Sequence, residues 1–274
     1  MRWGIRLIKK LILCLVIIFL MGLMVSCVSN DANQDNDLEE IPKGYKLNKN
    51  QLDNVEFHED RIYGLYRWVN PEDNSDWKDA LWSFSPYEEA NLIAEGKGLS
   101  FRVSKNNEYI AVEKQGAIEF YNEDGNLLKL ISSETINTED YAMVQLEKWN
   151  DNSNTLWCSL NETYNTIAYI KINTETWALE KYDDLNFNSA EHVLNPNTGW
   201  IVYSDYPVFL EITAFDEYME SEQMTTLSIY NLMTKENIEI EKSETNPFKP
   251  KWSNNHEILY YIGNQPFFYK LKEQ

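Results

Sequence analysis

Carboxylates are the most numerous groups in this sequence that could do acid–base chemistry. Glu56, Glu147 and Glu191 lie in or beside segments that alternate like β-strands. Two or three carboxyl groups about 5–10 Å apart can hydrolyse a glycosidic bond, with one as the acid and another as the base or nucleophile. Because the chain has 44 Asp and Glu residues, most of them are expected to be solvated, and a glycoside-hydrolase-like enzyme is an alternative rather than the leading hypothesis.

Other motifs of catalysis and metal binding are incomplete. His256-Glu257 starts like the zinc-binding His-Glu-x-x-His, but Tyr260 occupies the place of the second histidine. His58 and His192 are isolated, and the alternating asparagines of 150–154 lack the distal glutamate of a calcium loop. The sequence also has no Gly-x-Ser-x-Gly motif and no phosphate-binding glycine loop. We therefore expect no catalytic residue, no metal site and no cofactor.

Aromatic side chains in two long connections offer a surface for binding. Most of the nine Trp residues lie in strand patterns, where packing explains them, whereas Trp77 lies in the polar stretch Asn70–Asp79. The second connection runs from Tyr206 to about Thr225, and its part Val208–Phe215 alternates like a strand, which predicts a hairpin arm. The candidate partner-binding residues are Trp77, Tyr206, Phe209, Phe215 and Tyr218.

The first 26 residues have the pattern of an export signal. Four basic residues precede an uncharged run from Leu11 to Val25. This run suits the core of a signal peptide and is shorter than the ~20 residues that a membrane-spanning helix needs. A retained transmembrane anchor is the weaker alternative.

The segment Leu23-Met24-Val25-Ser26-Cys27 resembles the bacterial lipobox. This resemblance implies cleavage before Cys27, whose sulfur would carry a diacylglyceryl group with fatty acids such as palmitate. It also implies attachment to the cell membrane on the extracytoplasmic face. Two acyl chains anchor a protein stably where a single chain is marginal.

The charge of the chain disfavours some partners. Its 24 Lys and Arg residues against 44 Asp and Glu residues give a net charge of −20. Nucleic acids and anionic lipids attract clustered Lys and Arg, so we expect no nucleic-acid partner and membrane attachment through the lipid alone. Once residues 1–26 are removed, Cys158 is the only cysteine besides Cys27, so no intramolecular disulfide is expected.

Residues 27–43 are expected to be the lipidated cysteine and a flexible acidic tether. The stretch Val28–Pro42 is polar and nearly free of large apolar residues, so it cannot bury enough surface to fold. Residues 44–274 remain, which is enough for one all-β domain.

β-Strand signals dominate residues 44–274. Short runs of Val, Ile, Tyr, Phe and Trp are separated by Asn, Asp, Gly and Ser, and no segment has a convincing helical stripe. Polar turns that lead into strands start at Ser104, Asn150, Asn195 and Ser253. Their spacing is near the roughly 40–45 residues of a four-stranded propeller blade. The fold class is therefore predicted to be all-β.

The predicted strands fall into five sets, and the fifth lacks a fourth strand. The first two sets are Leu52–Phe57, Arg61–Val69, Ala80–Phe84 and Asn91–Ala94, then Leu99–Val103, Glu108–Glu113, Ala117–Tyr121 and Asn126–Ile131. The next two are Val144–Trp149, Thr155–Leu160, Thr166–Ile172 and Thr176–Lys181, then Glu191–Leu194, Trp200–Asp205, Thr226–Leu232 and Asn237–Glu241. The last is Phe248–Trp252, Glu257–Ile262 and Pro266–Leu271.

Strands and turns of this kind resemble the bacterial WD40-like and TolB-like β-propeller repeats, whose inner turn usually reads Ser-Pro-Asp-Gly. Asn195-Pro196-Asn197 is the nearest match in this chain. The resemblance implies a β-propeller of four-stranded blades, and the five predicted sets of strands imply five blades. Each repeat gains a core only by stacking on its neighbours, which favours a closed ring. A β-sandwich is the alternative, since strand content alone does not exclude it.

Two further features predict how the ring closes and where it binds. A strand-like stretch, Tyr45–Lys49, precedes the first set and is expected to pair with Pro266–Leu271, which would seal the incomplete last blade. Connections between second and third strands emerge on one face of a propeller. The long connections Asn70–Asp79 and Tyr206–Thr225 are therefore expected to form the walls of a binding surface.

The leading hypothesis is a lipid-anchored, extracytoplasmic β-propeller that binds a protein, peptide or glycan at the cell surface without chemistry of its own. The glycoside-hydrolase-like enzyme is one alternative. An accessory subunit of a membrane complex is the other.

Overall fold

A computed structural model describes residues 46–58, 61–85, 88–136, 143–188, 191–207, 212–221, 223–244 and 247–271, with the backbone alone for 46–53, 88–89 and 212–213. Cys27, the expected tether and Phe209 lie outside the described residues. The contacts divide the chain into the units Met1–Lys43 and Gly44–Gln274, and every described residue belongs to the second.

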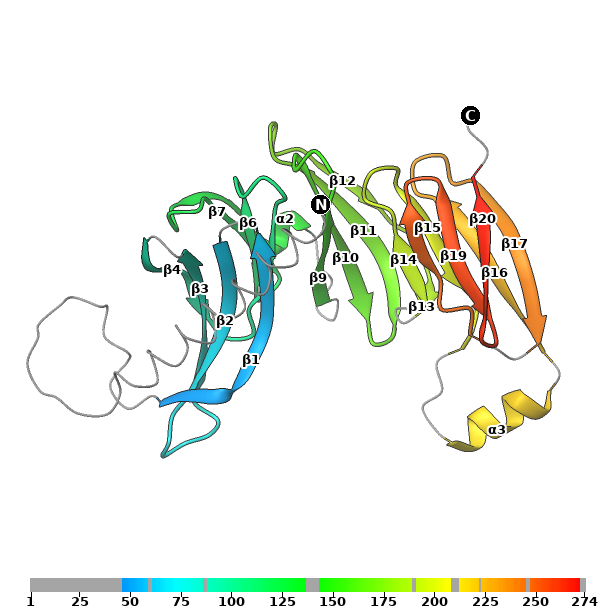
Figure 1. Ribbon diagram of the computed structural model, residues 1–274, viewed down its shortest axis with the longest axis horizontal. Coiled ribbons are helices and arrows are strands. Elements are labelled where there is room, and N and C mark those ends of the chain that lie inside the picture. Colours follow the sequence, from blue (N-terminus) through cyan, green and yellow to red (C-terminus); the bar gives the residue numbers. More distant parts are fainter. Residues whose placement is uncertain are drawn as a thin grey trace, which may run out of the picture. The chain divides into compact units, whose positions relative to one another are not determined.

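The described residues form antiparallel sheets in which consecutive strands are neighbours (Figure 1). The first sheet is β1 (Lys46–His58), β2 (Arg61–Val69), β3 (Trp77–Ser85) and β4 (Glu88–Gly96). The second is β5 (Ser100–Val103), β6 (Ile110–Lys114), β7 (Ala117–Tyr121) and β8 (Leu127–Ile131). The third is β9 (Met143–Trp149), β10 (Thr155–Glu162), β11 (Asn165–Asn173) and β12 (Leu179–Tyr182), with the short β13 (Phe187–Asn188) also paired to β11.

Two more sheets complete the described chain. The fourth is β14 (His192–Leu194), β15 (Trp200–Ser204), β16 (Met224–Asn231) and β17 (Asn237–Glu244), and the fifth is β18 (Lys251–Asn254), β19 (Glu257–Ile262) and β20 (Gln265–Lys270). The two described helices are α2 (Ser133–Ile136) and α3 (Ile212–Glu220). The prediction of an all-β fold is confirmed, and each predicted set of strands corresponds to one sheet.

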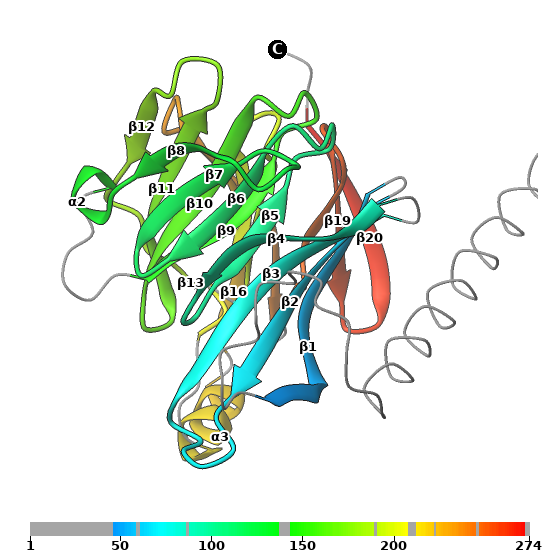
Figure 2. The ribbon, with the colours of Figure 1, turned by 90° about the vertical axis from the view of Figure 1, so that its left-hand side faces the viewer.

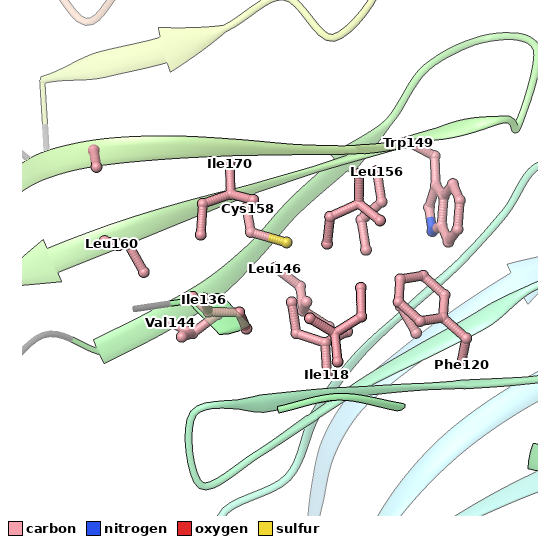
Figure 3. Packing of buried hydrophobic residues seen from close by; sticks show 14 residues of the cluster. Ile118, Phe120, Ile136, Val144, Leu146, Trp149, Leu156, Cys158, Leu160 and Ile170 are labelled. Atoms are coloured by element: carbon pink, nitrogen blue, oxygen red, sulfur yellow. The ribbon is translucent and has the colours of Figure 1, made fainter. Parts of the chain in front are cut away.

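Apolar side chains are buried between consecutive sheets. Strands alternate their side chains between two faces, so a strand of an inner sheet can bury both. Separate buried clusters join the first sheet to the second, the second to the third, the third to the fourth and the fourth to the fifth. The cluster between the second and third sheets contains Ile118 and Phe120 on one side and Leu156, Cys158 and Ile170 on the other (Figure 3).

The recurring polar turns join the first two strands of the second, third, fourth and fifth sheets. In three of them the first turn residue donates its backbone N–H to the carbonyl of the residue after the turn, over 2.8–2.9 Å: Ser104 to Tyr109, Asn150 to Thr155, and Asn195 to Trp200. These hydrogen bonds fix the start of the second strand in each sheet.

Side chains of neighbouring turns also bond to one another. Asp151 donates its N–H to Asn197 Oδ1 over 2.7 Å, and Asn197 Nδ2 donates to Asn255 Oδ1 over 2.7 Å. Asn106 donates its N–H to Ser153 Oγ over 3.2 Å. An amide side chain can donate and accept at once, so asparagine connects one turn to the next. The side chains of Asn197 and Asn255 therefore link neighbouring turns.

The predicted pairing between Tyr45–Lys49 and the last strand is wrong. Lys46 and Leu47 pair with Val69 and Trp68 of β2, and β20 pairs with β19. Residues 50 and 51 were expected to separate two strands, but β1 continues through them. The register shifts between Leu47 and Leu52 and again before Val55 absorb the extra residues.

The predicted hairpin arm in the second long connection is also wrong, because Ile212–Glu220 forms the helix α3. The segment mixes alternation with a helical spacing of Ile212, Phe215 and Met219, and short apolar segments do not distinguish the two patterns. Helix-forming Ala, Met and Glu decide the outcome locally. In both views, α3 and the 70–76 connection project from the same side of the sheets (Figures 1 and 2).

Candidate functional site

A pocket of about 420 Å³ lies between the third and fourth sheets. This volume falls within the ~300–1,000 Å³ typical of small-molecule sites. Its walls come from the turn between β10 and β11, from β13 and the residue before it, and from the end of β15. The described lining residues are Tyr164, Asn165, Asn186, Asn188, Tyr203, Ser204, Asp205, Tyr206 and Pro207.

Strand β13 brings asparagine side chains to the pocket. Phe187 and Asn188 pair with Thr166 and Asn165 of β11. Side chains alternate along an extended chain, so Phe187 is buried in the core while Asn186 and Asn188 face the opposite way. On this wall, Phe187 therefore packs into the core behind the pocket, and the amides of Asn186 and Asn188 line the pocket itself.

Hydrogen bonds fix the opposite wall. Asp205 donates its N–H to the Thr226 carbonyl over 3.1 Å, and Thr226 donates its N–H to Asp205 Oδ1 over 2.6 Å. Across the pocket, Asn188 Nδ2 donates to the Tyr206 carbonyl over 2.6 Å. Because this last bond joins β13 to the segment after β15, the two walls are held together without a ligand.

Helix α3 is attached to the rim of this pocket through tyrosines. The rings of Tyr206 and Tyr218 meet edge to face with their centroids 5.7 Å apart. The Tyr218 and Thr225 hydroxyls are 2.6 Å apart and hydrogen bonded. Phe215 lies on the same helix and is 37% exposed. Of the predicted binding residues, Tyr206 lines the pocket and Tyr218 packs against it.

Trp77 is not a loop residue, because it is the first residue of β3 and pairs with Val69. The Arg67 guanidinium lies over its ring, 4.3 Å from the centroid, and Lys97 Nζ lies 5.8 Å away. Arg67 Nε also donates to the buried Asp79 carboxylate over 2.8 Å. The indole therefore covers a structural ion pair, which the sequence does not reveal because these residues are distant in the chain.

A buried polar network lies behind the pocket. His192 Nδ1 donates to the Asn188 carbonyl over 2.8 Å, and Nε2 lies 3.4 Å from Thr166 Oγ1. Thr166 in turn donates to the Asn161 side chain. Burial lowers the pKa of His192, although the hydrogen bond to Asn188 and the charge of Glu147 oppose this effect. The lowered pKa favours the neutral form of His192, which lies behind the pocket lining.

Two of the three carboxylates considered for catalysis have structural partners. Glu56 Oε2 accepts the Val103 N–H over 2.9 Å and so ties β1 to β5, and Glu147 Oε1 accepts the Ser159 hydroxyl over 2.6 Å. Glu191 differs in that burial raises its pKa, although a hydrogen bond to the Lys249 backbone and the Lys249 charge oppose this effect. Its buried Oε2 has no hydrogen-bond partner within the described part of the chain.

Most of the pocket residues were missed from the sequence. Tyr164 lies in an ordinary polar hairpin turn and Asn165 begins the strand after it, whereas Asn186 and Asn188 lie in a segment that was expected to be a connection. A usable signal was the alternation Leu185-Asn186-Phe187-Asn188, which is typical of a strand with one polar face.

The described residues include neither a membrane-spanning helix nor a cluster of metal-binding side chains. No helix there is both long and apolar enough to cross a membrane. In the same part of the chain, no three or more His, Cys, Asp or Glu side chains are arranged to hold a metal ion.

No family model and no curated protein matches this sequence. Solved structures do match. The β-propeller domain of the Trilobed protease from Pyrococcus furiosus, described as having an open velcro topology, is 12% identical with a TM-score of 0.53; the match covers 84% of this chain and 70% of that one. An oligogalacturonate lyase in complex with manganese is 12% identical with a TM-score of 0.50, over 78% of this chain and 62% of that one.

TolB from Acinetobacter baumannii also matches, at 12% identity and a TM-score of 0.40, over 76% of this chain and 48% of that one. At these identities the matches establish the fold alone. The chain has a β-propeller fold.

Proposed function

We propose that this protein is a lipid-anchored, extracytoplasmic β-propeller that binds a protein, peptide or glycan at the cell surface without catalysing a reaction. We further propose that its five sheets are the blades of one propeller. The pocket between the third and fourth sheets is the proposed binding site, and Tyr206 and Tyr218 belong to it or to its rim.

The composition of the pocket is the observation that carries this proposal. Its described lining holds three tyrosines, three asparagines and a single carboxylate, Asp205. Most glycosidases use two carboxyl groups about 5–10 Å apart, and one Asp205 oxygen already accepts the Thr226 N–H. Aromatic rings with a few fixed polar groups are typical of binding sites.

The anchor is proposed from the sequence around Cys27. We expect Cys27→Ala to abolish labelling with a radioactive fatty acid and to release the protein from washed membranes. Cys14→Ala is the matched control and should leave both unchanged. A Cys27→Ala protein that is still labelled and membrane-bound would refute the anchor.

The binding role is tested by chemical cross-linking and pull-down from intact cells with the anchored protein. The double variant Tyr164→Ala, Tyr206→Ala should lose partners that the wild type retains, while circular dichroism shows an unchanged fold. Phe268→Ala, an exposed change on β20, is the control. An identical set of partners from the double variant would remove the pocket as the functional site.

One observation favours the glycoside-hydrolase-like alternative. A general acid needs a raised pKa, and burial gives Glu191 such a shift. If this alternative holds, purified wild-type protein should release reducing ends from polysaccharides and Glu191→Gln should not. We expect no release from either protein.

A further inference from the structure

We propose that the pocket between the third and fourth sheets binds an uncharged pyranose sugar at the end of a glycan chain. This inference rests on the proposed binding function and specifies its ligand. It starts from the groups that line the pocket and are still able to bond.

Several lining groups already have partners inside the protein. Asn188 Nδ2 holds the Tyr206 carbonyl, Ser204 Oγ accepts the Tyr206 N–H over 3.1 Å, and the Tyr203 hydroxyl donates to Asn237 Oδ1 over 3.2 Å. These bonds build the walls. They leave fewer groups for a ligand than the composition of the lining suggests.

Three lining side chains form no hydrogen bond within the described part of the chain: Tyr164, Asn165 and Asn186. Tyr164 is 45% exposed, so much of its ring is available at the mouth of the pocket. Tyr164 lies in the turn between β10 and β11, Asn165 is paired within β11, and Asn186 directly precedes β13. The backbone of Asn165 is therefore fixed by strand pairing before a ligand arrives, which lowers the entropy cost of binding there.

This set matches the chemistry of a pyranose. Each sugar hydroxyl is a donor and an acceptor, and an asparagine amide can satisfy both roles at once. The sugar ring also has an apolar face of C–H groups, for which the flat face of Tyr164 is a suitable surface. A lysine or a carboxylate would offer only one of the two hydrogen-bonding roles.

Charge restricts the sugar to an uncharged one. None of the described lining residues is a lysine or an arginine, whereas Asp205 is a carboxylate. The whole chain carries a net charge of −20. A uronate or a phosphorylated sugar would therefore meet repulsion without a counter-charge. A hexose or an N-acetylhexosamine would not.

The test measures binding of trisaccharides to the full-length protein purified in detergent. Chitotriose, maltotriose and cellotriose are the uncharged probes, and trigalacturonate is the charged probe, each titrated up to about 10 mM by calorimetry and saturation-transfer NMR. We expect at least one uncharged probe to bind and trigalacturonate to bind at least about tenfold more weakly. No binding of an uncharged probe, or tighter binding of trigalacturonate, overturns the inference.

Variants locate the binding. Tyr164→Ala and the double variant Asn165→Ala, Asn186→Ala should each weaken the affinity for the bound sugar at least about tenfold. Asn152→Ala, an exposed change in the turn between β9 and β10, should not. Equal affinities in all variants overturn the inference, provided that circular dichroism and melting temperatures match the wild type.

Failure of this inference can be told apart from failure of the proposed function. If the pull-down finds a pocket-dependent protein or peptide and no uncharged sugar binds, the binding function stands and the sugar is wrong. If the pull-down finds no pocket-dependent partner and no sugar binds, both are wrong.

Discussion

The third sheet buries both of its faces, but the two faces are chemically different. Toward the second sheet, β10 and β11 present Leu156, Cys158 and Ile170 in an apolar cluster (Figure 3). Toward the fourth sheet the same strands present Trp157 and Tyr169, whose rings are 6.5 Å apart. Ser159, Asn161 and Thr166, with their buried hydrogen bonds, belong to this second group.

This difference separates apolar packing from the polar network behind the pocket within one sheet. Successive side chains of a strand point to opposite faces, so one face can carry apolar side chains and the other a polar network. Burying apolar area stabilises the fold directly, whereas buried polar groups contribute little net stability and specify geometry. The apolar face is expected to hold the third sheet in place, and the polar face is expected to shape the pocket.

The largest expected effect is on the apolar face. Leu156→Ala removes a fully buried side chain and should lower the free energy of unfolding by about 2–5 kcal/mol, measured by urea denaturation. Leu128→Ala on β8, whose side chain is 45% exposed, is the matched control and should change it by less than about 0.5 kcal/mol. If Leu156→Ala and Leu128→Ala lowered the free energy of unfolding by similar amounts, the apolar face would not be the stabilising one.

An intermediate effect is expected from pH on the polar face. Burial lowers the pKa of His192 below 6.5 in the folded protein, so the unfolded chain binds more protons just below pH 6.5. This contribution to stability is present above pH 6.5 and is lost as the pH falls toward the folded pKa. Between pH 7.5 and 5.5, wild-type protein should lose up to about 1 kcal/mol more than His192→Gln.

Glu113 and Glu191 act in the opposite direction, because burial raises their pKa values above 4.5. Their unfavourable contribution grows as the pH rises above 4.5. Comparison with His192→Gln isolates the histidine, since both proteins retain these carboxylates. Parallel stability curves for the two proteins would show that His192 is not buried as described.

The smallest expected effect is on thiol labelling. Burial raises the pKa of Cys158 far above its ordinary value, with smaller contributions from the charges of Glu147 and Glu113. A thiolate is the reactive form, so folded wild-type protein should show essentially no reaction of Cys158 with a thiol reagent, and urea should restore it. Rapid labelling of the folded protein would mean that the apolar face opens.

The sequence predicted much of the architecture because strand and turn signals are local. Each predicted set of strands corresponds to a sheet, and the turns at Ser104, Asn150 and Asn195 are closed by local backbone hydrogen bonds. The predictions for residues 46–58 and for α3 were wrong, because two local sequence patterns compete in each segment. In residues 46–58, register shifts let one strand continue through the polar residues. In the second long connection, a nine-residue helix forms where a strand was expected.

The candidate site depended on contacts between distant residues. Trp77 was expected to lie in a loop, but it begins β3 with Arg67 and Lys97 over its ring, and its role in binding a partner stays a prediction. Asn165 and Asn188 come together only because the short β13 pairs with β11. No spacing in the sequence encodes this pairing, so Tyr206 was the one predicted residue that the structure places in the pocket.

The most direct test of this account is an NMR titration of isotope-labelled full-length protein with the uncharged trisaccharide that binds best. We expect the side-chain amide signals of Asn165 and Asn186 to shift as sugar is added and to stop shifting once the site is saturated. The side-chain amide of Asn152, at the other end of the third sheet, should not shift. Saturable shifts that leave Asn165 and Asn186 unchanged would contradict the assignment of this pocket as the binding site.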